Sequence, residues 1–380
     1  MVELARFYAS RGLKISRASM QYVWDVDGVR YLDLHTGHGA AFLGHGNPRI
    51  VKRVYRQWME IGVCTPQFEC NIQAEASRLL SSILPEGWSV FFQNSGAEAV
   101  EAALKAAWLY TGRVRVAAFK GSFHGRTLAA LSVTWNPKYR SGLPALEMVD
   151  FLPFNNVSGL DAIGDEHAAV IVEPVQGEGG VVPASIDFLR EVAKAARRAG
   201  ALLILDEIQA GFGRTGYTWA YQRAGIEPDI LVAGKSIGGG FPVSMVAARK
   251  DIVEALKGRH GSTHGGNPLA LAAVAGGVEV LISEDVPAKA MVRGKELMEL
   301  LEGIESLRGV RHVRGLGLMA GVELRRNPGP VLRCLQERRI LAIKAGVTVV
   351  RLLPPYMVTP EDLGVAVDGL RECIRREAGG

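Results

Sequence analysis

The sequence has little that would mark a secreted, membrane-bound or fibrous protein. It holds four cysteines in 380 residues, none of them in a CxxC pair, and four is too few to cross-link a chain of this length. The longest apolar-rich stretch, 269–282, is broken by two glycines and a glutamate, and residues 1–17 carry charges throughout. We therefore expect neither a membrane span nor a secretory signal, and we predict a cytoplasmic protein in a reducing compartment.

Charge is not concentrated in any segment either. The chain has 44 basic and 39 acidic residues, a net charge of +5, and a pI near 9.0. It has no run of like charge long enough for a nucleic-acid-binding tail, no internal repeat and no low-complexity segment. We expect no nucleic-acid partner, whereas an acidic protein partner is compatible with the basic excess.

Glycine, in contrast, is abundant, with 45 residues in 380. This is well above its average usage of roughly 7%, and it predicts many positions where the backbone turns tightly or approaches a ligand closely. Hydrophobic residues make up 48% and charged residues 22%, which excludes a disordered chain.

Short apolar runs alternate with amphipathic helical patterns through the middle of the chain. The runs end at Gln93, Phe119, Val172, Leu205 and Gly234, and helical patterns cover 97–110 and 187–199. This alternation predicts an α/β fold with a mostly parallel sheet covered on both faces. Ligands of such sheets bind beyond the carboxyl ends of the strands, so the residues directly after each run are the candidates for a functional site.

The two ends of the chain do not follow this rhythm. Residues 22–34 alternate between apolar and polar around Asp27–Gly28, which predicts a hairpin. Helical patterns over 268–282, 286–304, 330–338 and after Thr359, with a strand near 317–324, predict a smaller α+β unit.

Two polar residues that end neighbouring apolar runs carry the main chemical signal. Asp206 ends one run, and a buried carboxylate needs a partner, although by itself it could be a structural ion pair or a helix cap. Lys235 ends the next run and precedes a glycine-rich loop. Pyridoxal phosphate requires this pair, because a lysine amine forms a Schiff base with its aldehyde and an aspartate keeps its ring nitrogen protonated.

Two further segments could complete such a site. Ser95, Gly96 and Ala97 follow an apolar run and open a helix, where free backbone N–H groups bind phosphate. Phe123 and Arg126 follow the next run. The phenylalanine could stack on a planar ring and the arginine could clasp a carboxylate, although core packing and a surface charge would explain the same residues.

The segments SGAEA, FHGRT, EPVQGEGG, LDEIQAGFGRTG, GKSIGGGFP and STHGGNPLA together resemble class III pyridoxal-phosphate aminotransferases of fold type I, in particular those acting on acetylornithine and ornithine. The resemblance runs from Tyr22 to Tyr356. It implies a large domain with a mainly parallel seven-stranded sheet, a small α+β domain built from both chain ends, and a homodimer with shared active sites. We accordingly predict an N-terminal segment, 1–44, that joins the small domain, a cofactor-binding domain, 45–268, and a C-terminal small domain, 269–380.

The resemblance also implies roles for individual residues. Lys235 and Asp206 would be catalytic, and no metal is expected. The residues implied in binding pyridoxal phosphate are Ser95, Gly96 and Ala97 at the phosphate, Phe123 on the ring, Asp206 at the ring nitrogen, Gln209 at the ring hydroxyl, Lys235, and Thr263 at the phosphate of the neighbouring subunit.

Four residues are implied in substrate binding: Arg126, Glu178, Ser262 and Arg351. Glu178 would pair with Arg351 while a terminal primary amine is bound. When Glu178 moves away, Arg351 would receive the α-carboxylate of glutamate or 2-oxoglutarate, and Arg126 the far carboxylate.

The loop 36–48 refines the expected substrate. Its glycines could form no more than a turn with a packing role. However, its GHG and LGHGNP segments resemble aminotransferases of carrier-protein-dependent lysine and arginine synthesis, found in archaea and thermophilic bacteria. The implied substrate is a semialdehyde attached to a small acidic amino-group carrier protein, which the pI near 9.0 would suit.

Two alternatives stay open. The first is an acetylornithine, ornithine or 4-aminobutyrate aminotransferase acting on free substrates. The second is a lyase, a racemase or a binding-only relative with the same fold. The intact set of Asp206, Gln209 and Lys235 argues against binding alone, and Glu178 with Arg351 argues for a glutamate half-reaction, which lyases and racemases do not need.

Overall fold

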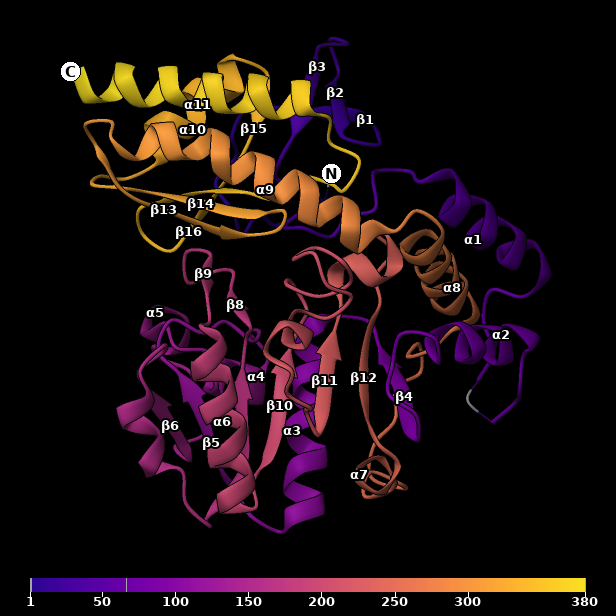
Figure 1. The fold of residues 1–380 in the computed structure, drawn as a ribbon. Coiled ribbons are helices and arrows are strands. Elements are labelled where there is room, and N and C mark those ends of the chain that lie inside the picture. Colours follow the sequence, from indigo (N-terminus) through magenta and orange to yellow (C-terminus); the bar gives the residue numbers. More distant parts are fainter. Residues whose placement is uncertain (1, 66, 380) are drawn as a thin grey trace.

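The computed structural model describes residues 2–65 and 67–379, and it is built around a seven-stranded sheet (Figure 1). The strands lie in the order β4 (Trp88–Gln93), β12 (Ser244–Arg249), β11 (Ile230–Ala233), β10 (Leu202–Asp206), β7 (His167–Val172), β5 (Arg115–Phe119) and β6 (Val149–Leu152). Within this sheet, six strands run in the same direction and β12 runs in the opposite one. The predicted α/β fold with a mainly parallel sheet is confirmed.

Both faces of this sheet are buried, which is why its central strands are apolar except for His167 at the start of β7 and Asp206 at the end of β10. Val170 and Val172 of β7 pack in one core cluster with residues of α6 (Ile186–Ala199). Ile171, between them, points to the opposite cluster, which holds residues of α3 (Gly96–Thr111). Alternate residues of one strand thus pack into two separate hydrophobic cores, as expected for a sheet between two helical layers.

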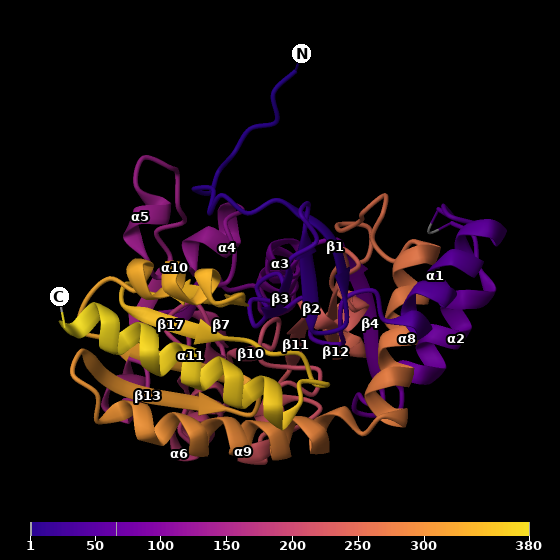
Figure 2. The same cartoon turned by 90° about the horizontal axis from the view of Figure 1, so that it is seen from above.

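The two chain ends meet in a second layer above the carboxyl ends of the large sheet (Figures 1 and 2). The predicted hairpin is present as β2 (Tyr22–Asp25) and β3 (Arg30–Asp33), flanked by β1 (Ile15–Ser19) and by β15 (Ile340–Leu341), which pairs in parallel with β3. A further sheet has the order β13 (Val310–Leu316), β14 (Met319–Leu324), β17 (Val349–Leu352) and β16 (Ile343–Ala345). The pairing of β3 with β15 supports the prediction of a small domain built from both ends, and the boundaries at 44 and 268 stay predictions.

The remaining elements are helices and one short ribbon. The longer helices are α1 (Pro48–Glu60), α2 (Asn71–Leu80), α8 (Pro268–Ser283), α9 (Val286–Glu305), α10 (Gly329–Glu337) and α11 (Pro360–Gly379). The short ones are α4 (Leu128–Ser132), α5 (Pro137–Arg140), α7 (Lys250–Glu254), η1 (Val157–Ala162), η2 (Ala220–Ala224) and η3 (Lys235–Gly238), and the ribbon is β8 (Val175–Gln176) with β9 (Val182–Pro183). Within residues 2–65 and 67–379, no helix is long and apolar enough to cross a membrane.

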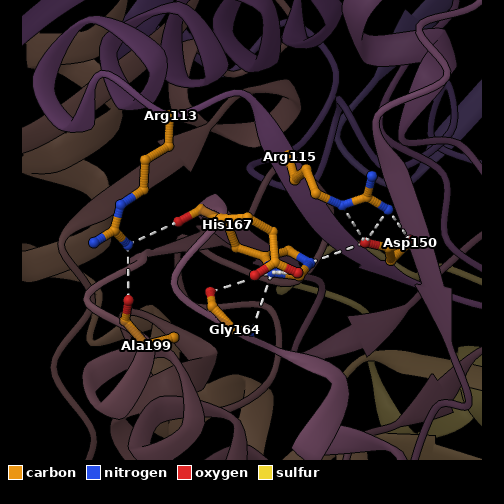
Figure 3. Close-up of polar contacts among 7 residues, drawn as sticks. Arg113, Arg115, Asp150, Gly164, His167 and Ala199 are labelled. Carbon is orange, nitrogen blue, oxygen red and sulfur yellow. Dashed lines mark hydrogen bonds and ion pairs between the residues drawn. The ribbon is translucent and has the colours of Figure 1, made fainter.

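Polar contacts brace the amino ends of β5 and β7, at the sheet edge opposite the carboxyl ends (Figure 3). His167, which is fully buried, lies with Nε2 3.0 Å from Asp150 Oδ2, and Arg115 Nε donates to the same oxygen at 3.0 Å. Arg113 Nη1 donates to the backbone carbonyls of His167 and of Ala199, the last residue of α6. This network ties the edge strand β6 and helix α6 to the centre of the sheet.

A disulfide joins Cys334 in α10 to Cys373 in α11, with 5.7 Å between the two Cα atoms. The expectation that the cysteines do not cross-link the chain is wrong for this pair. The sequence concealed the bond because the two residues are 39 positions apart and become neighbours only when α10 packs on α11. Intracellular proteins of hyperthermophiles also contain disulfides, so the bond does not by itself place the protein outside the cell.

We expect Cys334→Ser to lower the free energy of unfolding by up to about 4 kcal/mol, because the closed loop restricts the unfolded chain. Chemical denaturation without reductant measures this change. Cys70→Ser, which removes a free and partly buried thiol, is the matched control and should have a smaller effect. Equal losses in the two variants would mean that the bond contributes nothing specific to stability.

Candidate active site

A cavity of about 360 Å³ lies at the carboxyl ends of the strands β4, β5, β7, β10 and β11. Most of the predicted site residues line it: Gly96, Ala97, Phe123, Arg126, Glu178, Asp206, Gln209 and Lys235. They come from separate loops that the sheet brings together, as is usual for an open α/β sheet.

Lys235 lies two residues after the end of β11 and begins η3 with a positive φ of 47°, which lysine rarely adopts. In the sheet, Asp206 on β10 pairs with Val232, three residues before the lysine, so both side chains reach the same edge. Burial lowers the pKa of the Lys235 amine to about 8, against the opposing pull of Glu178 and Asp206. The neutral, nucleophilic form of the amine is therefore accessible near neutral pH.

Asp206 is buried at the end of β10 and has a partner that the sequence analysis did not assign. Its Oδ2 lies 2.7 Å from Nδ1 of His124, and its Oδ1 accepts a hydrogen bond from the backbone N–H of Ile208 at 3.0 Å. The backbone N–H of His124 donates to Thr134 Oγ1, which fixes the loop. These contacts hold the carboxylate in one orientation toward the cavity.

Glu173 positions two loops of the site. Its carboxylate accepts hydrogen bonds from the backbone N–H groups of Phe123 at 2.9 Å and of Gly177 at 3.2 Å. Burial raises the pKa of Glu173 to about 7, although the nearby His124 opposes this shift. The glutamate thus connects the loop that carries Phe123 to the loop that carries Glu178.

The amino end of α3 faces the cavity. Ser95 caps the helix: its Oγ accepts from the N–H of Glu98, and the Glu98 carboxylate accepts from the N–H of Ser95 at 2.7 Å. Gly96 and Ala97 line the cavity as the first residues of the helix, where N–H groups lack intrahelical acceptors. A Cβ on Gly125 would lie 2.7 Å from the Ala97 Cβ, so this glycine allows the Phe123 loop to approach the helix end closely.

Arg351, Glu178 and Gln209 form a connected polar group at the side of the cavity. Arg351 is fully buried on β17, and its Nη1 donates to Glu178 at 2.7 Å and to Gln209 Oε1 at 2.9 Å. Although burial raises the pKa of Glu178, the nearby His38 and the charge of Arg351 bring it well below its usual range. Among the described residues, Arg351 Nε and Nη2 are buried and have no hydrogen-bond partner.

Arg126 lies at the mouth of the cavity, in contact with the N-terminal segment. It donates a hydrogen bond to the hydroxyl of Tyr8, and its guanidinium lies 5.6 Å from the centre of that ring. Ser262 and Thr263, in contrast, lie in the loop between α7 and α8 and do not line this cavity. Ser262 Oγ accepts a hydrogen bond from the Gly265 N–H instead.

Three residues of the site, Tyr8, His38 and His124, were not predicted from the sequence to have a role. The only signal for His124 was its place after a strand, beside the residues that were assigned roles. Tyr8 and His38 come from the N-terminal region, far in sequence from the residues that they contact.

The cavity fits pyridoxal phosphate in its chemistry. An amine, a fixed carboxylate and a helix amino end meet in it, which are the groups that the aldehyde, the ring nitrogen and the phosphate need. A Cβ on Gly177 would lie 1.9 Å from Gln209 Oε1, so the glycine is needed for Gln209 to lie where it does. Over the described part of the chain, no group of three or more His, Cys, Asp or Glu residues is placed to hold a metal ion.

Residues 6–374 match the family Aminotransferase class-III, and the chain belongs to this family of pyridoxal-phosphate-dependent aminotransferases. It is 49% identical over 375 residues to the LysW-aminoadipate semialdehyde/glutamate semialdehyde transaminase of Sulfolobus acidocaldarius, covering 98% of this chain and 97% of the relative. A protein of Aeropyrum pernix that carries the same name provisionally is 53% identical over 380 aligned positions, and the alignment covers 98% of each chain. An ornithine aminotransferase structure from Toxoplasma gondii superposes with a TM-score of 0.94 at 31% identity, over 99% of this chain and 93% of that one.

Proposed function

We propose that this enzyme transfers an amino group between glutamate or 2-oxoglutarate and a terminal semialdehyde carried by a small acidic amino-group carrier protein, in cytoplasmic lysine or arginine synthesis. The observation that carries the proposal is the full-length similarity to LysW-linked transaminases, 49% for the Sulfolobus acidocaldarius enzyme. The acetylornithine aminotransferase of Bacillus subtilis, at 39% identity over 98% of both chains, supports the second candidate, a free acetylated substrate.

Most of the cofactor contacts proposed here are those that the resemblance implies, and His124 is added to them. Lys235 would bind the aldehyde carbon, and Asp206, oriented by His124, would keep the ring nitrogen protonated. The amides of Gly96 and Ala97 would hold the phosphate, with Phe123 on the ring. When bound, pyridoxal phosphate withdraws electrons from the substrate carbon that bears the amine. In this arrangement the Lys235 amine is also placed to move a proton at that carbon.

Substrate alternation would depend on the ion pair of Glu178 and Arg351. In the closed pair, Glu178 neutralises the arginine and leaves no free cation for an α-carboxylate. Two buried nitrogens of Arg351 without a partner support a second state in which a substrate carboxylate bonds them, because buried donors without acceptors are unfavourable. Gln209 holds the arginine by Nη1 and would keep it in place in both states.

The surroundings of the cavity mouth support an acidic carrier. The N-terminal segment, which reaches Arg126 through Tyr8, carries three exposed cations, Arg6, Lys14 and Arg17, against one acid, Glu3. The guanidinium of Arg11 is instead bound to the backbone carbonyls of Leu332 and Ala342. Tyr139 of α5 packs on Phe123 with ring centres 5.9 Å apart, and this brings the exposed Lys138 to the same region. Positive charge around a site speeds its encounter with an acidic partner.

We expect the KM for a carrier-linked substrate to rise steeply as ionic strength increases from 0.1 M to 1 M, because the Debye length falls from about 10 Å to 3 Å. Turnover of free N-acetylornithine, which lacks the acidic carrier, is the matched control and should change much less. Steady-state kinetics at several salt concentrations measure both. If the two substrates respond equally to salt, the charge argument for a carrier fails.

We also propose that the chain is a homodimer with shared active sites. Helix α1 lies at the outer edge of the molecule (Figure 2). Its exposed apolar side chains are Val51, Tyr55, Trp58 and Met59, at 53%, 67%, 64% and 69% exposure. Exposed apolar groups of this kind mark protein contacts. The position of Thr263 outside this chain's own cavity is compatible with a contact to the cofactor of a second subunit.

A further inference from the structure

The loop after β3 holds an unusual backbone conformation beside the active site. Four successive residues have positive φ: Thr36 at 44°, Gly37 at 58°, His38 at 58° and Gly39 at 92°. For threonine and histidine this conformation is unfavourable, and it persists only where the surroundings enforce it.

Buried contacts on both sides enforce it here. Thr36 Oγ1 donates to the backbone carbonyl of Leu353 at 2.8 Å, two residues beyond Arg351 on the same chain segment. Arg214, which is fully buried, donates from Nη2 to the carbonyl of Gly39 at 2.7 Å. The loop is thus fastened to the segment that carries Arg351, and His38 is presented at a fixed place.

That place is next to Glu178. The Nδ1 atom of His38 lies 3.8 Å from Glu178 Oε1, the same oxygen that Arg351 Nη1 holds at 2.7 Å. At this distance His38 is a weak partner that helps to keep Glu178 ionised, whereas the hydrogen bond of the carboxylate is with the arginine. A small movement of Glu178 toward the loop would bring its oxygen into hydrogen-bonding distance of His38.

Within the described part of the chain, the His38 ring has no hydrogen bond that would prevent it from making that bond. Its neighbours are the His35 ring, 4.8 Å away between centres, and the Tyr8 ring at 6.4 Å. Burial lowers the pKa of His35 to about 4, so His35 is neutral near pH 7 and its Nδ1 accepts from the backbone N–H of His38 at 3.2 Å. His35 therefore fixes the loop without competing for Glu178.

A carboxylate that loses its cation in a partly buried site needs another donor. The Glu178 side chain is 27% exposed, and a substrate carboxylate that binds Arg351 would leave it without the arginine. We propose that His38 is the second partner of Glu178: it accepts the released carboxylate by a hydrogen bond and so stabilises the state in which Arg351 binds the α-carboxylate of glutamate or 2-oxoglutarate. The inference rests on the proposed substrate alternation and makes His38 a positioning residue.

The test uses the holoenzyme and glutarate, a five-carbon dicarboxylate without an amino group, whose binding requires Arg351 to be released. His38→Gly keeps the backbone conformation but removes the donor, and we expect it to weaken glutarate binding by about 10- to 100-fold, as measured by titration calorimetry. His38→Asn should restore most of the affinity, because its amide nitrogen occupies the place of Nδ1 and asparagine tolerates positive φ. His38→Asp, which sets a like charge beside Glu178, should weaken binding at least as much as glycine.

Two controls separate this role from a structural one. The KM for N-acetylornithine, whose amine is bound with the ion pair closed, should change little in the three variants. In a Glu178→Gln background, His38→Gly should have no further effect on the affinity for glutarate, because the negative charge that His38 would stabilise is absent. His312→Asn, at an exposed pair with Glu305, should behave as the parent enzyme does.

The outcomes distinguish two failures. The quantity to compare is the ratio of the glutarate Kd to the KM for N-acetylornithine. If Glu178→Gln changes this ratio but His38→Gly does not, the role of His38 is overturned and the alternation stands. If neither substitution changes the ratio, the alternation itself fails. If His38→Gly weakens glutarate equally in the Glu178→Gln background, the histidine acts on the loop or on the ligand directly, and the inference is overturned.

Discussion

Replacing Lys235 by alanine should abolish transamination, with a loss in kcat of about 10⁴-fold or more. The Lys235 amine faces the cavity from the end of β11, next to the carboxylate of Asp206, and its lowered pKa makes it nucleophilic near neutral pH. Steady-state kinetics with glutamate and 2-oxoglutarate measure the loss.

The assignment can be checked directly on the unmodified enzyme. Borohydride reduction followed by peptide mapping should place the pyridoxyl group on Lys235. Lys250→Ala, at the start of α7 at the end of the large sheet away from the cavity (Figure 1), is the matched control and should keep full activity. Labelling of any other lysine would contradict the assignment.

Asp206→Asn should leave the cofactor bound but reduce kcat by about 10² to 10³-fold, the loss typical of removing one fixed charge from an active site. The amide cannot hold the ring nitrogen protonated, whereas Lys235 and the amino end of α3 still hold the rest of the group. Absorption spectra measure cofactor retention, and steady-state kinetics measure the loss.

The neighbouring acid gives a matched control. Glu207 accepts hydrogen bonds from the N–H groups of Ala220 and Tyr221, and burial raises its pKa to about 8, so it is mostly neutral at pH 7. Glu207→Gln should therefore affect stability more than kcat. A near-normal kcat in Asp206→Asn, or equal losses in both variants, would refute the specific pairing of Asp206 with the ring.

The predicted site residues that line the cavity were found from one property of parallel sheets. Asp206 and Lys235 end adjacent strands, and the carboxyl ends of parallel strands meet at one edge, so their proximity did not require knowledge of the loops. Gly96 and Phe123 were located in the same way, because each follows a recognisable apolar run.

What the sequence did not predict depends on contacts between distant segments. His124 meets Asp206 across 82 positions, and Tyr8 meets Arg126 across 118. β12 is the antiparallel exception in the sheet, and the 39-residue separation of Cys334 and Cys373 concealed their disulfide. The role proposed for His38 depends on a loop conformation that no local pattern encodes, since two of its four residues with positive φ are not glycine.

The central claim, that the enzyme acts on a carrier-linked semialdehyde, is tested most directly by comparing kcat/KM for two acceptors that differ only in the carrier. The purified enzyme with glutamate as donor would be given the semialdehyde attached to the acidic carrier protein, and then the same semialdehyde with an N-acetyl group in place of the carrier. The account predicts a kcat/KM higher by about tenfold or more for the carrier-linked acceptor. The reason is that the basic residues around the cavity mouth attract the acidic carrier, whereas the acetylated acceptor has no carrier to be attracted. Equal values, or a preference for the acetylated acceptor, would contradict it and identify the enzyme as one acting on free substrates.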